Sequence, residues 1–255
     1  MPEQPKELGG MPRKELTVFY VLDTSGSMAG EKISALNHAM EECIDALTDL
    51  AKEHGDAKLK IAILEFNSGC KWITSNGPEY LEEDFEYEYL ETGGLTDVGT
   101  ALTELNSKLS QRAYLKSMTG ALMPIIIFMS DGYATDDWKK PLEKIRENKW
   151  FRRATKIGFA LGDDPDVSMI SSVVGNSEAV IKTTDLELFK RLMKFVTVTS
   201  SMTNSTSQTP DTTTTGADIV GESGVEEPNK VQDDELTEEY IPEPETWSEE
   251  EDEEW

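Results

Sequence analysis

The sequence has few cysteines, which cross-link small secreted proteins, and few of the basic residues that bind nucleic acid. Only two of its 255 residues are cysteines, Cys43 and Cys70, so neither a disulfide framework nor a cysteine-rich zinc motif is available. At its helical position Cys43 falls on an apolar face, which predicts a buried thiol. Lysine and arginine total 24 against 50 aspartates and glutamates, for a net charge of −26. Because clustered basic side chains hold a phosphate backbone, this balance argues against a nucleic-acid partner.

Long hydrophobic runs are also lacking. The longest apolar run, residues 121–129, is far shorter than the roughly 20 residues needed to cross a bilayer. Residues 1–10 have no apolar core of the kind found in signal peptides. There is no glycine-rich phosphate loop ending in Gly-Lys-Ser/Thr, and the two histidines have no sequence partner for a catalytic dyad. We therefore expect a cytoplasmic protein with no membrane contact and no hydrolytic site.

The acidic residues are concentrated near the C-terminus. Residues 201–255 contain 18 aspartates and glutamates and a single lysine. Serine and threonine dominate the stretch before them, with no apolar periodicity, which is typical of a linker followed by a disordered tail. We expect a flexible N-terminus over 1–13, one globular domain over 14–197, a Ser/Thr-rich linker over 198–217 and an acidic disordered tail over 218–255.

Strand and helix patterns alternate along residues 14–197. Apolar runs predict strands at 16–22, 59–66, 70–74, 123–129, 155–161 and 179–183. Helical spacing predicts helices beginning near 31 and 98 and spanning 137–148, 167–174 and 186–195, the third of them capped by Asp136. This alternation favours an α/β fold with a doubly wound, mostly parallel six-stranded sheet and one short antiparallel edge strand.

Hydroxyl and carboxylate side chains follow the two most apolar strands. Asp23, Ser25 and Ser27 come after the first strand, and Asp131 comes after the strand at 123–129. Thr96 stands at the head of a helix, after two glycines. Ligands of open parallel sheets bind beyond the carboxyl ends of the strands, so these side chains are expected to converge. Hard oxygen ligands of this kind suit Mg²⁺ or Mn²⁺, and so small a set leaves a coordination position for an outside carboxylate.

Together these motifs resemble the metal-ion-dependent adhesion site of von Willebrand factor type A domains, and the resemblance covers roughly residues 14–197. It is carried by Asp23-x-Ser25-x-Ser27, Gly94-Leu95-Thr96-Asp97 and Ser130-Asp131-Gly132. The resemblance implies that Ser25 and Ser27 ligate the metal directly, that Thr96 changes its role with the ligation state, and that Asp23 and Asp131 act largely through water. Thr92 and Thr100 are nearby alternatives. Thr96 is preferred because it lies five residues before Ala101-Leu102, as is usual in the family.

A narrower similarity is to bacterial cytoplasmic A domains of the tellurium-resistance type. It rests on residues 23–28, Gly30-Glu31, residues 129–132 and residues 135–138. That group is associated with Ser/Thr protein kinases and phosphatases in stress or defence signalling. The resemblance therefore implies partners in such a pathway.

The function expected from these motifs is metal-dependent protein binding without catalysis, in which a partner's Asp or Glu completes the metal shell. We assign partner contacts to Gly26, Met28 and Tyr133 beside the site. An adaptor subunit of an ATPase machine would use the same site in the same way. A metal-dependent phosphohydrolase is less well supported, because Asp23 is followed two residues later by Ser25 and not by a second aspartate.

The acidic tail contains isolated apolar residues that could anchor it to a second partner. Leu236, Tyr240 and Trp247 stand out of the acidic background. Two alternatives remain open at this point: a solubilising brush, or a tail glutamate that occupies the domain's own metal site. For the Ser/Thr-rich stretch, phosphorylation and an unmodified spacer are both compatible with the composition.

Overall fold

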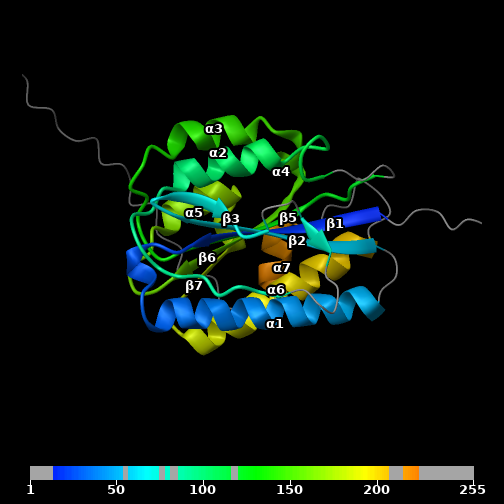
Figure 1. The fold of residues 1–255 in the computed structure, drawn as a ribbon, viewed down its shortest axis with the longest axis horizontal. Coiled ribbons are helices and arrows are strands. Elements are labelled where there is room, and N and C mark those ends of the chain that lie inside the picture. Colours follow the sequence, from blue (N-terminus) through cyan, green and yellow to red (C-terminus); the bar gives the residue numbers. More distant parts are fainter. Residues whose placement is uncertain are drawn as a thin grey trace, which may run out of the picture.

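A computed structural model describes residues 14–53, 57–74, 78–80, 86–115, 120–206 and 215–223. At its centre lies a sheet with the strand order β3-β2-β1-β5-β6-β7, and β4 also pairs with β2 (Figure 1). The strands are β1 (Lys14–Asp23), β2 (Ala57–Asn67), β3 (Gly69–Trp72), β4 (Glu79–Tyr80), β5 (Ile125–Ser130), β6 (Thr155–Leu161) and β7 (Val180–Thr183). All neighbouring pairs on the main path are parallel except β2 with β3. The predicted six-stranded sheet is confirmed, and the antiparallel two-residue β4 is an addition to it.

Helices cover both faces of the sheet, as Figure 1 shows. One face carries α1 (Glu31–Glu53), α6 (Leu186–Thr206) and α7 (Gly216–Glu222). The other carries α2 (Val98–Lys108), α3 (Lys139–Arg146), α4 (Lys149–Arg153) and α5 (Val167–Val174). Two single 3₁₀ turns complete the described elements, at Gly26–Met28 and Ser177–Ala179. None of the helices in the described ranges is both long and apolar enough to cross a membrane.

The apolar run of β1 is buried because each face of the strand meets a different helical layer. Tyr20 and Leu22 belong to the core shared with α1 and α6, whereas Phe19 and Val21 belong to the core shared with α2 and α5. Successive side chains of a strand point to opposite faces, so a strand covered on both sides needs apolar residues at every position. Cys43 is fully buried in the first of these cores, as predicted.

The structure differs from the sequence expectation at the end of the globular domain. Helix α6 extends to Thr206, well past the predicted end at residue 195 and into the stretch expected to be a linker. In this last part of α6, Thr197, Ser200 and Ser201 are fully buried. The Ser200 hydroxyl donates to the carbonyl of Val196, one turn earlier. A serine hydroxyl bonded in this way fits a packed helix, so composition alone did not reveal the extension of α6. Phosphorylation at the three buried hydroxyls would require the helix to open.

Helix α7 lies in the region expected to be linker and tail. Its first turn is held by a capping box, in which the Thr215 side chain accepts from the amide of Asp218 and the Asp218 carboxylate accepts from the amide of Thr215. Ile219 and Val220 reach the core beneath α6. The start of the tail is thereby fixed to the domain. Residues 207–214 and 224–255 lie outside the described ranges.

The predicted helix over 137–148 corresponds to α3, whereas the short α4 that follows it was not predicted. The predicted cap residue, Asp136, does not cap α3: its carboxylate accepts from the backbone amides of Gly99 and Thr100, at the start of α2. Asp136 therefore stabilises a helix that lies nearly 40 residues earlier in the chain. This contact depends on the packing of α2 against α3, which no local pattern encodes.

Candidate metal centre

The site is built where β1 and β5 lie side by side. These two strands are parallel and in register, with Leu22 opposite Met129. After β1 the chain passes to α1 on one face of the sheet, and after β5 it passes to α3 on the other. Diverging connections leave a crevice at the carboxyl ends of such neighbouring strands. The loops after Asp23 and Ser130 therefore face each other, as predicted.

Asp23 lies buried at the base of this crevice and is held by donors on both carboxylate oxygens. The Ser25 amide donates to Oδ1 at 2.8 Å, and the Ser130 hydroxyl donates to Oδ2 at 2.6 Å. Burial raises the pKa of Asp23, these hydrogen bonds oppose the rise, and the nearby charge of Asp131 adds to it. With both oxygens already engaged, Asp23 orients the two loops. This fits the expected role through water better than direct ligation.

Two hydroxyls and a second carboxylate converge at the mouth of the crevice. The Ser25 and Ser27 Oγ atoms are 3.0 Å apart, and the Ser27 hydroxyl donates to Asp131 Oδ1 at 2.7 Å. The Asp131 side chain is fully buried, whereas Ser27 is exposed. The structure thus joins Asp23, Ser25, Ser27 and Asp131 in one hydrogen-bonded cluster of oxygen atoms.

Lys32 also reaches this cluster, and sequence analysis did not identify it. Its ammonium lies 2.5 Å from Asp131 Oδ2 and 3.4 Å from the carbonyl oxygen of Ser27. The other flank of the side chain lies against Gly162, where a Cβ added to the glycine would come within 3.3 Å of Nζ. The Lys32 side chain is 32% exposed. In the sequence it is one charged residue in the first turn of a helix, a position typical of a solvated side chain.

The loop bearing Thr96 is joined to both other loops of the site by hydrogen bonds of its backbone. The Gly26 amide donates to the carbonyl of Gly94 at 3.2 Å. The Thr135 amide donates to the Thr96 carbonyl at 2.9 Å, and the Thr135 hydroxyl accepts from the Thr96 amide at the same distance. The Thr96 hydroxyl makes no hydrogen bond to the four-residue cluster in the described structure. Thr96 is therefore brought to the rim, with its side chain outside the cluster.

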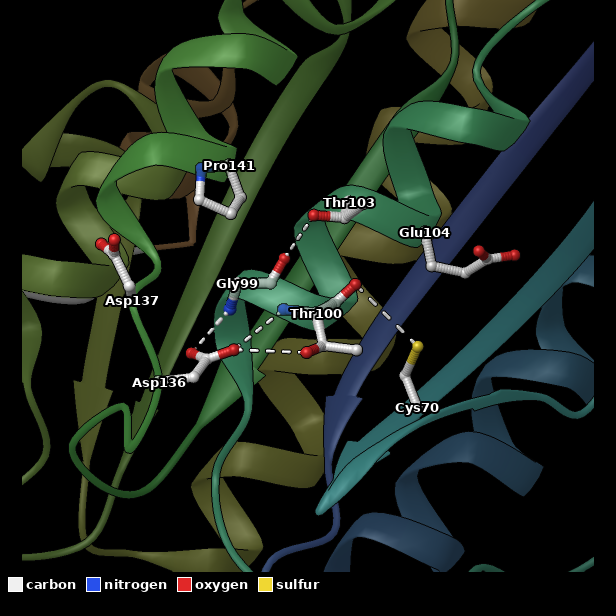
Figure 2. A pocket seen from close by; sticks show the side chains of 8 residues that line it. All are labelled: Cys70, Gly99, Thr100, Thr103, Glu104, Asp136, Asp137 and Pro141. Carbon is white, nitrogen blue, oxygen red and sulfur yellow. Dashed lines mark hydrogen bonds between the residues drawn. The ribbon is translucent and has the colours of Figure 1, made fainter.

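A second hollow lies beside this rim, between α2 and the start of α3. Figure 2 shows how the Asp136 carboxylate points at the amides of Gly99 and Thr100. The cavity measures about 330 Å³ and is lined by Cys70, Gly99, Thr100, Thr103, Glu104, Asp136, Asp137 and Pro141. Thr100, one of the alternative threonines, faces this hollow and bonds Asp136, so it does not serve the metal cluster.

The oxygen atoms of the cluster fit a small, hard divalent cation. Among the described residues no group of three or more His, Cys, Asp and Glu side chains is placed to hold a metal ion, and the donors of this cluster are instead hydroxyls and two carboxylates. Two hydroxyls and the Asp131 carboxylate are oxygen donors of the kind preferred by Mg²⁺, which commonly keeps several water ligands. The Lys32 ammonium acts as a stand-in cation at the same carboxylate. The residues present therefore fit a divalent cation.

The predicted partner-contact residues divide into those at the surface and those away from it. Gly26 is exposed, and the Tyr133 side chain is 58% exposed. Met28 is fully buried in the core against α1, so its assignment as a contact residue is wrong. Leu95, 57% exposed on the second loop, is a surface residue that the assignment missed. The signal was present, since an apolar residue after Gly93-Gly94 in a loop has no core to join. Leu236, Tyr240 and Trp247 lie outside the described residues.

Residues 18–134 match the sequence model of the von Willebrand factor type A domain. This stretch includes all three loops of the site. No curated protein sequence matches the chain.

Several solved structures share the fold of this chain. A von Willebrand factor type A protein from Catenulispora acidiphila aligns with a TM-score of 0.54 at 18% identity, over 74% of this chain and 43% of its own. Proximal thread matrix protein 1 from the mussel byssus, with a zinc-occupied MIDAS motif, aligns with a TM-score of 0.51 at 15% identity, over 73% of this chain and 48% of its own. A mutant PilB minor pilin from Streptococcus sanguinis aligns with a TM-score of 0.52 at 14% identity, over 78% of this chain and 63% of its own. This chain spans less than two thirds of each.

Proposed function

Because residues 18–134 match the sequence model of the von Willebrand factor type A domain, we propose that this chain is a metal-dependent protein-binding module and not an enzyme. Domains with this fold commonly mediate metal-dependent protein interactions. The observation that carries the proposal is the cluster of Asp23, Ser25, Ser27 and Asp131, joined by hydrogen bonds at the carboxyl ends of two adjacent strands.

The metal proposed for the site is Mg²⁺ or Mn²⁺. Ser25 and Ser27 would hold it directly and Asp131 largely through water, with Asp23 orienting the loops and Thr96 available from the rim. The bound cation would supply a positive charge able to accept a carboxylate from outside. The zinc-occupied site of the mussel byssus protein supports a divalent ion at this place in the fold. The hard oxygen donors of this chain favour the lighter ions.

The proposed partner presents an aspartate or glutamate next to apolar surface. Ser27 and Gly26 are exposed at the mouth of the crevice, so an outside carboxylate can approach without rearrangement of the core. Leu95 and Tyr133 flank the mouth on separate loops, and each exposes more than half of its side chain. Exposed aromatic and aliphatic side chains beside a charged centre provide the apolar contacts that a protein partner needs.

The similarity to tellurium-resistance-type domains supports a cytoplasmic role in stress or defence signalling beside a Ser/Thr kinase and a phosphatase. That similarity rests on the residues around Asp23 and Asp131 and on Thr135-Asp136-Asp137-Trp138. An ATPase adaptor would use the same site, and the identity of captured partners separates the two roles. We also propose that the acidic tail serves a contact of its own, separate from the metal site.

Calorimetry tests the proposal directly. The double variant Ser25→Ala, Ser27→Ala removes two donors while leaving the core intact, so binding of Mg²⁺ and Mn²⁺ should be lost with an unchanged melting temperature. Ser34→Ala, Ser172→Ala removes two hydroxyls away from the site and should bind like the wild type. Unchanged metal affinity in the first variant would refute the proposal.

Affinity capture from the native host tests whether partner binding depends on the metal. A metal-dependent partner should be retained by the wild type, released by EDTA and missed by Asp23→Ala. If neither EDTA nor Asp23→Ala reduces capture of the partner, the metal has no role in partner binding.

A further inference from the structure

One segment of this acidic chain is markedly basic. Residues 139–156 contain eight of its 24 lysines and arginines and only two glutamates. This segment forms α3, α4 and the start of β6. In a chain with a net charge of −26, so compact a basic region stands apart from the rest of the surface.

A cavity opens at the end of this segment. It measures about 340 Å³ and lies between α4, the start of β6, the end of α5 and the start of α7. Its polar lining consists of Arg152, Arg153, Lys156, Asn176 and Thr215. Because it lies where β6 begins, whereas the metal cluster lies where β1 and β5 end, the two sites occupy opposite edges of the parallel sheet.

The cations lining this basic cavity are not neutralised by the part of the chain that the structure describes. Among the described residues, no carboxylate pairs with Arg152, Arg153 or Lys156. The partly buried Lys156 ammonium donates to the carbonyls of Phe151 and Ala154, at 3.0 and 3.1 Å. Loss of solvation lowers the pKa of Lys156 accordingly. A desolvated positive charge without a counter-charge is unfavourable, so the cavity is suited to an anion.

The chain itself carries a polyanion that starts one short helix away from the cavity. Helix α7 lines the cavity with Thr215 and Gly216 and ends at Glu222. Residues 224–255 contain 15 aspartates and glutamates and one lysine. A random-coil chain of that length would have a root-mean-square end-to-end distance of roughly 30 Å. Helix α7, which separates the start of this segment from the cavity, is only about 10 Å long, so the segment can reach back to the cavity. Tethering at this distance gives an effective concentration on the order of millimolar.

We infer that carboxylates of residues 224–255 bind the basic cavity at Arg152, Arg153 and Lys156 of the same chain. The tail would then be drawn to the edge of the sheet away from the metal cluster, leaving the cluster open to a partner. This contact would be electrostatic and only partly desolvated, so it should weaken steeply with salt.

Paramagnetic relaxation in the full-length chain tests this contact. A nitroxide on Glu243→Cys, with Cys70→Ser to remove the more accessible native thiol, would broaden amides near the docked tail. We expect signals of residues 152–156 and 176–179 to lose most of their intensity, and those around Asp23 to keep theirs. The effect should disappear in about 0.5 M NaCl, where the Debye length falls to about 4 Å.

Two charge-reversal variants make the test specific. Arg152→Glu, Arg153→Glu changes exposed residues of the cavity and should abolish the broadening, with the melting temperature as the folding control. Lys71→Glu, Arg191→Glu makes the same change in net charge away from the cavity and should leave the broadening intact.

Three results would overturn the inference. The first is no broadening at residues 152–156, and the second is equal broadening in both charge-reversal variants. The third is broadening that persists when spin-labelled and isotope-labelled chains are separate molecules in a mixture, which would assign the contact to a second copy.

Discussion

Replacing Lys32 by methionine should strengthen metal binding, even though the substitution removes a charged side chain from the site. The Lys32 ammonium lies 2.5 Å from Asp131 Oδ2, and a metal drawing on that carboxylate has to compete with it. Hydrogen bonds to charged groups are worth about 1.5–3 kcal/mol net. Because the Lys32 side chain is 32% exposed, solvent screening reduces this to about 1–2 kcal/mol.

That energy corresponds to about a 5- to 30-fold gain in affinity for Mg²⁺ or Mn²⁺ in Lys32→Met. Isothermal titration at low salt measures it. Lys32→Arg keeps the charge and should bind as weakly as the wild type. Without metal, Lys32→Met leaves the buried Asp131 carboxylate without its ion-pair partner, so the melting temperature of the variant should fall, and added Mg²⁺ should raise it more than in the wild type. Equal or weaker metal affinity in Lys32→Met would refute the reasoning.

Three further substitutions and reactions test other parts of the structure. Asp23→Asn should raise the metal-free melting temperature by a few degrees while weakening metal binding, because burial raises the pKa of Asp23 and its ionised form is costly to bury; a lower melting temperature at pH 7 would contradict this. Cys43 should resist alkylation at pH 8 in the folded protein while Cys70 reacts, because burial raises the pKa of Cys43 to about 12; peptide mass mapping distinguishes the two thiols. Gly158→Ala should destabilise the fold by about 1–3 kcal/mol in urea unfolding, because its Cβ would lie 2.6 Å from Ile170; an unchanged midpoint would show that the helix yields.

Much of the fold could be predicted from local patterns. The apolar run of β1 is buried on both faces, and its end at Asp23 places a carboxylate and two hydroxyls on one short loop. Those three positions lie close together in the chain, so local sequence determines their spacing. The two strands bearing Asp23 and Asp131 could be expected to be neighbours because their apolar composition marks them as central.

Contacts between distant segments needed the tertiary structure. Lys32 meets Asp131 across 99 residues, and Asp136 caps α2 instead of its own helix. Local periodicity cannot report either contact, because both depend on how two helices pack against the sheet. The burial of Met28 has the same origin, since the turn after Ser25 points its side chain toward α1.

The C-terminal part shows the same division between sequence and structure. Composition alone identified the acidic character of residues 224–255, which depends on nothing but residue counts. It misassigned the end of α6, because burial of Ser200 and Ser201 is possible only where a neighbouring layer covers them. The basic cavity likewise joins Arg152 and Lys156 to Thr215, about 60 residues away, through the packing of α7 against β6. Residue types are a property of the chain, whereas the environment that desolvates a cation exists only once distant segments are packed together.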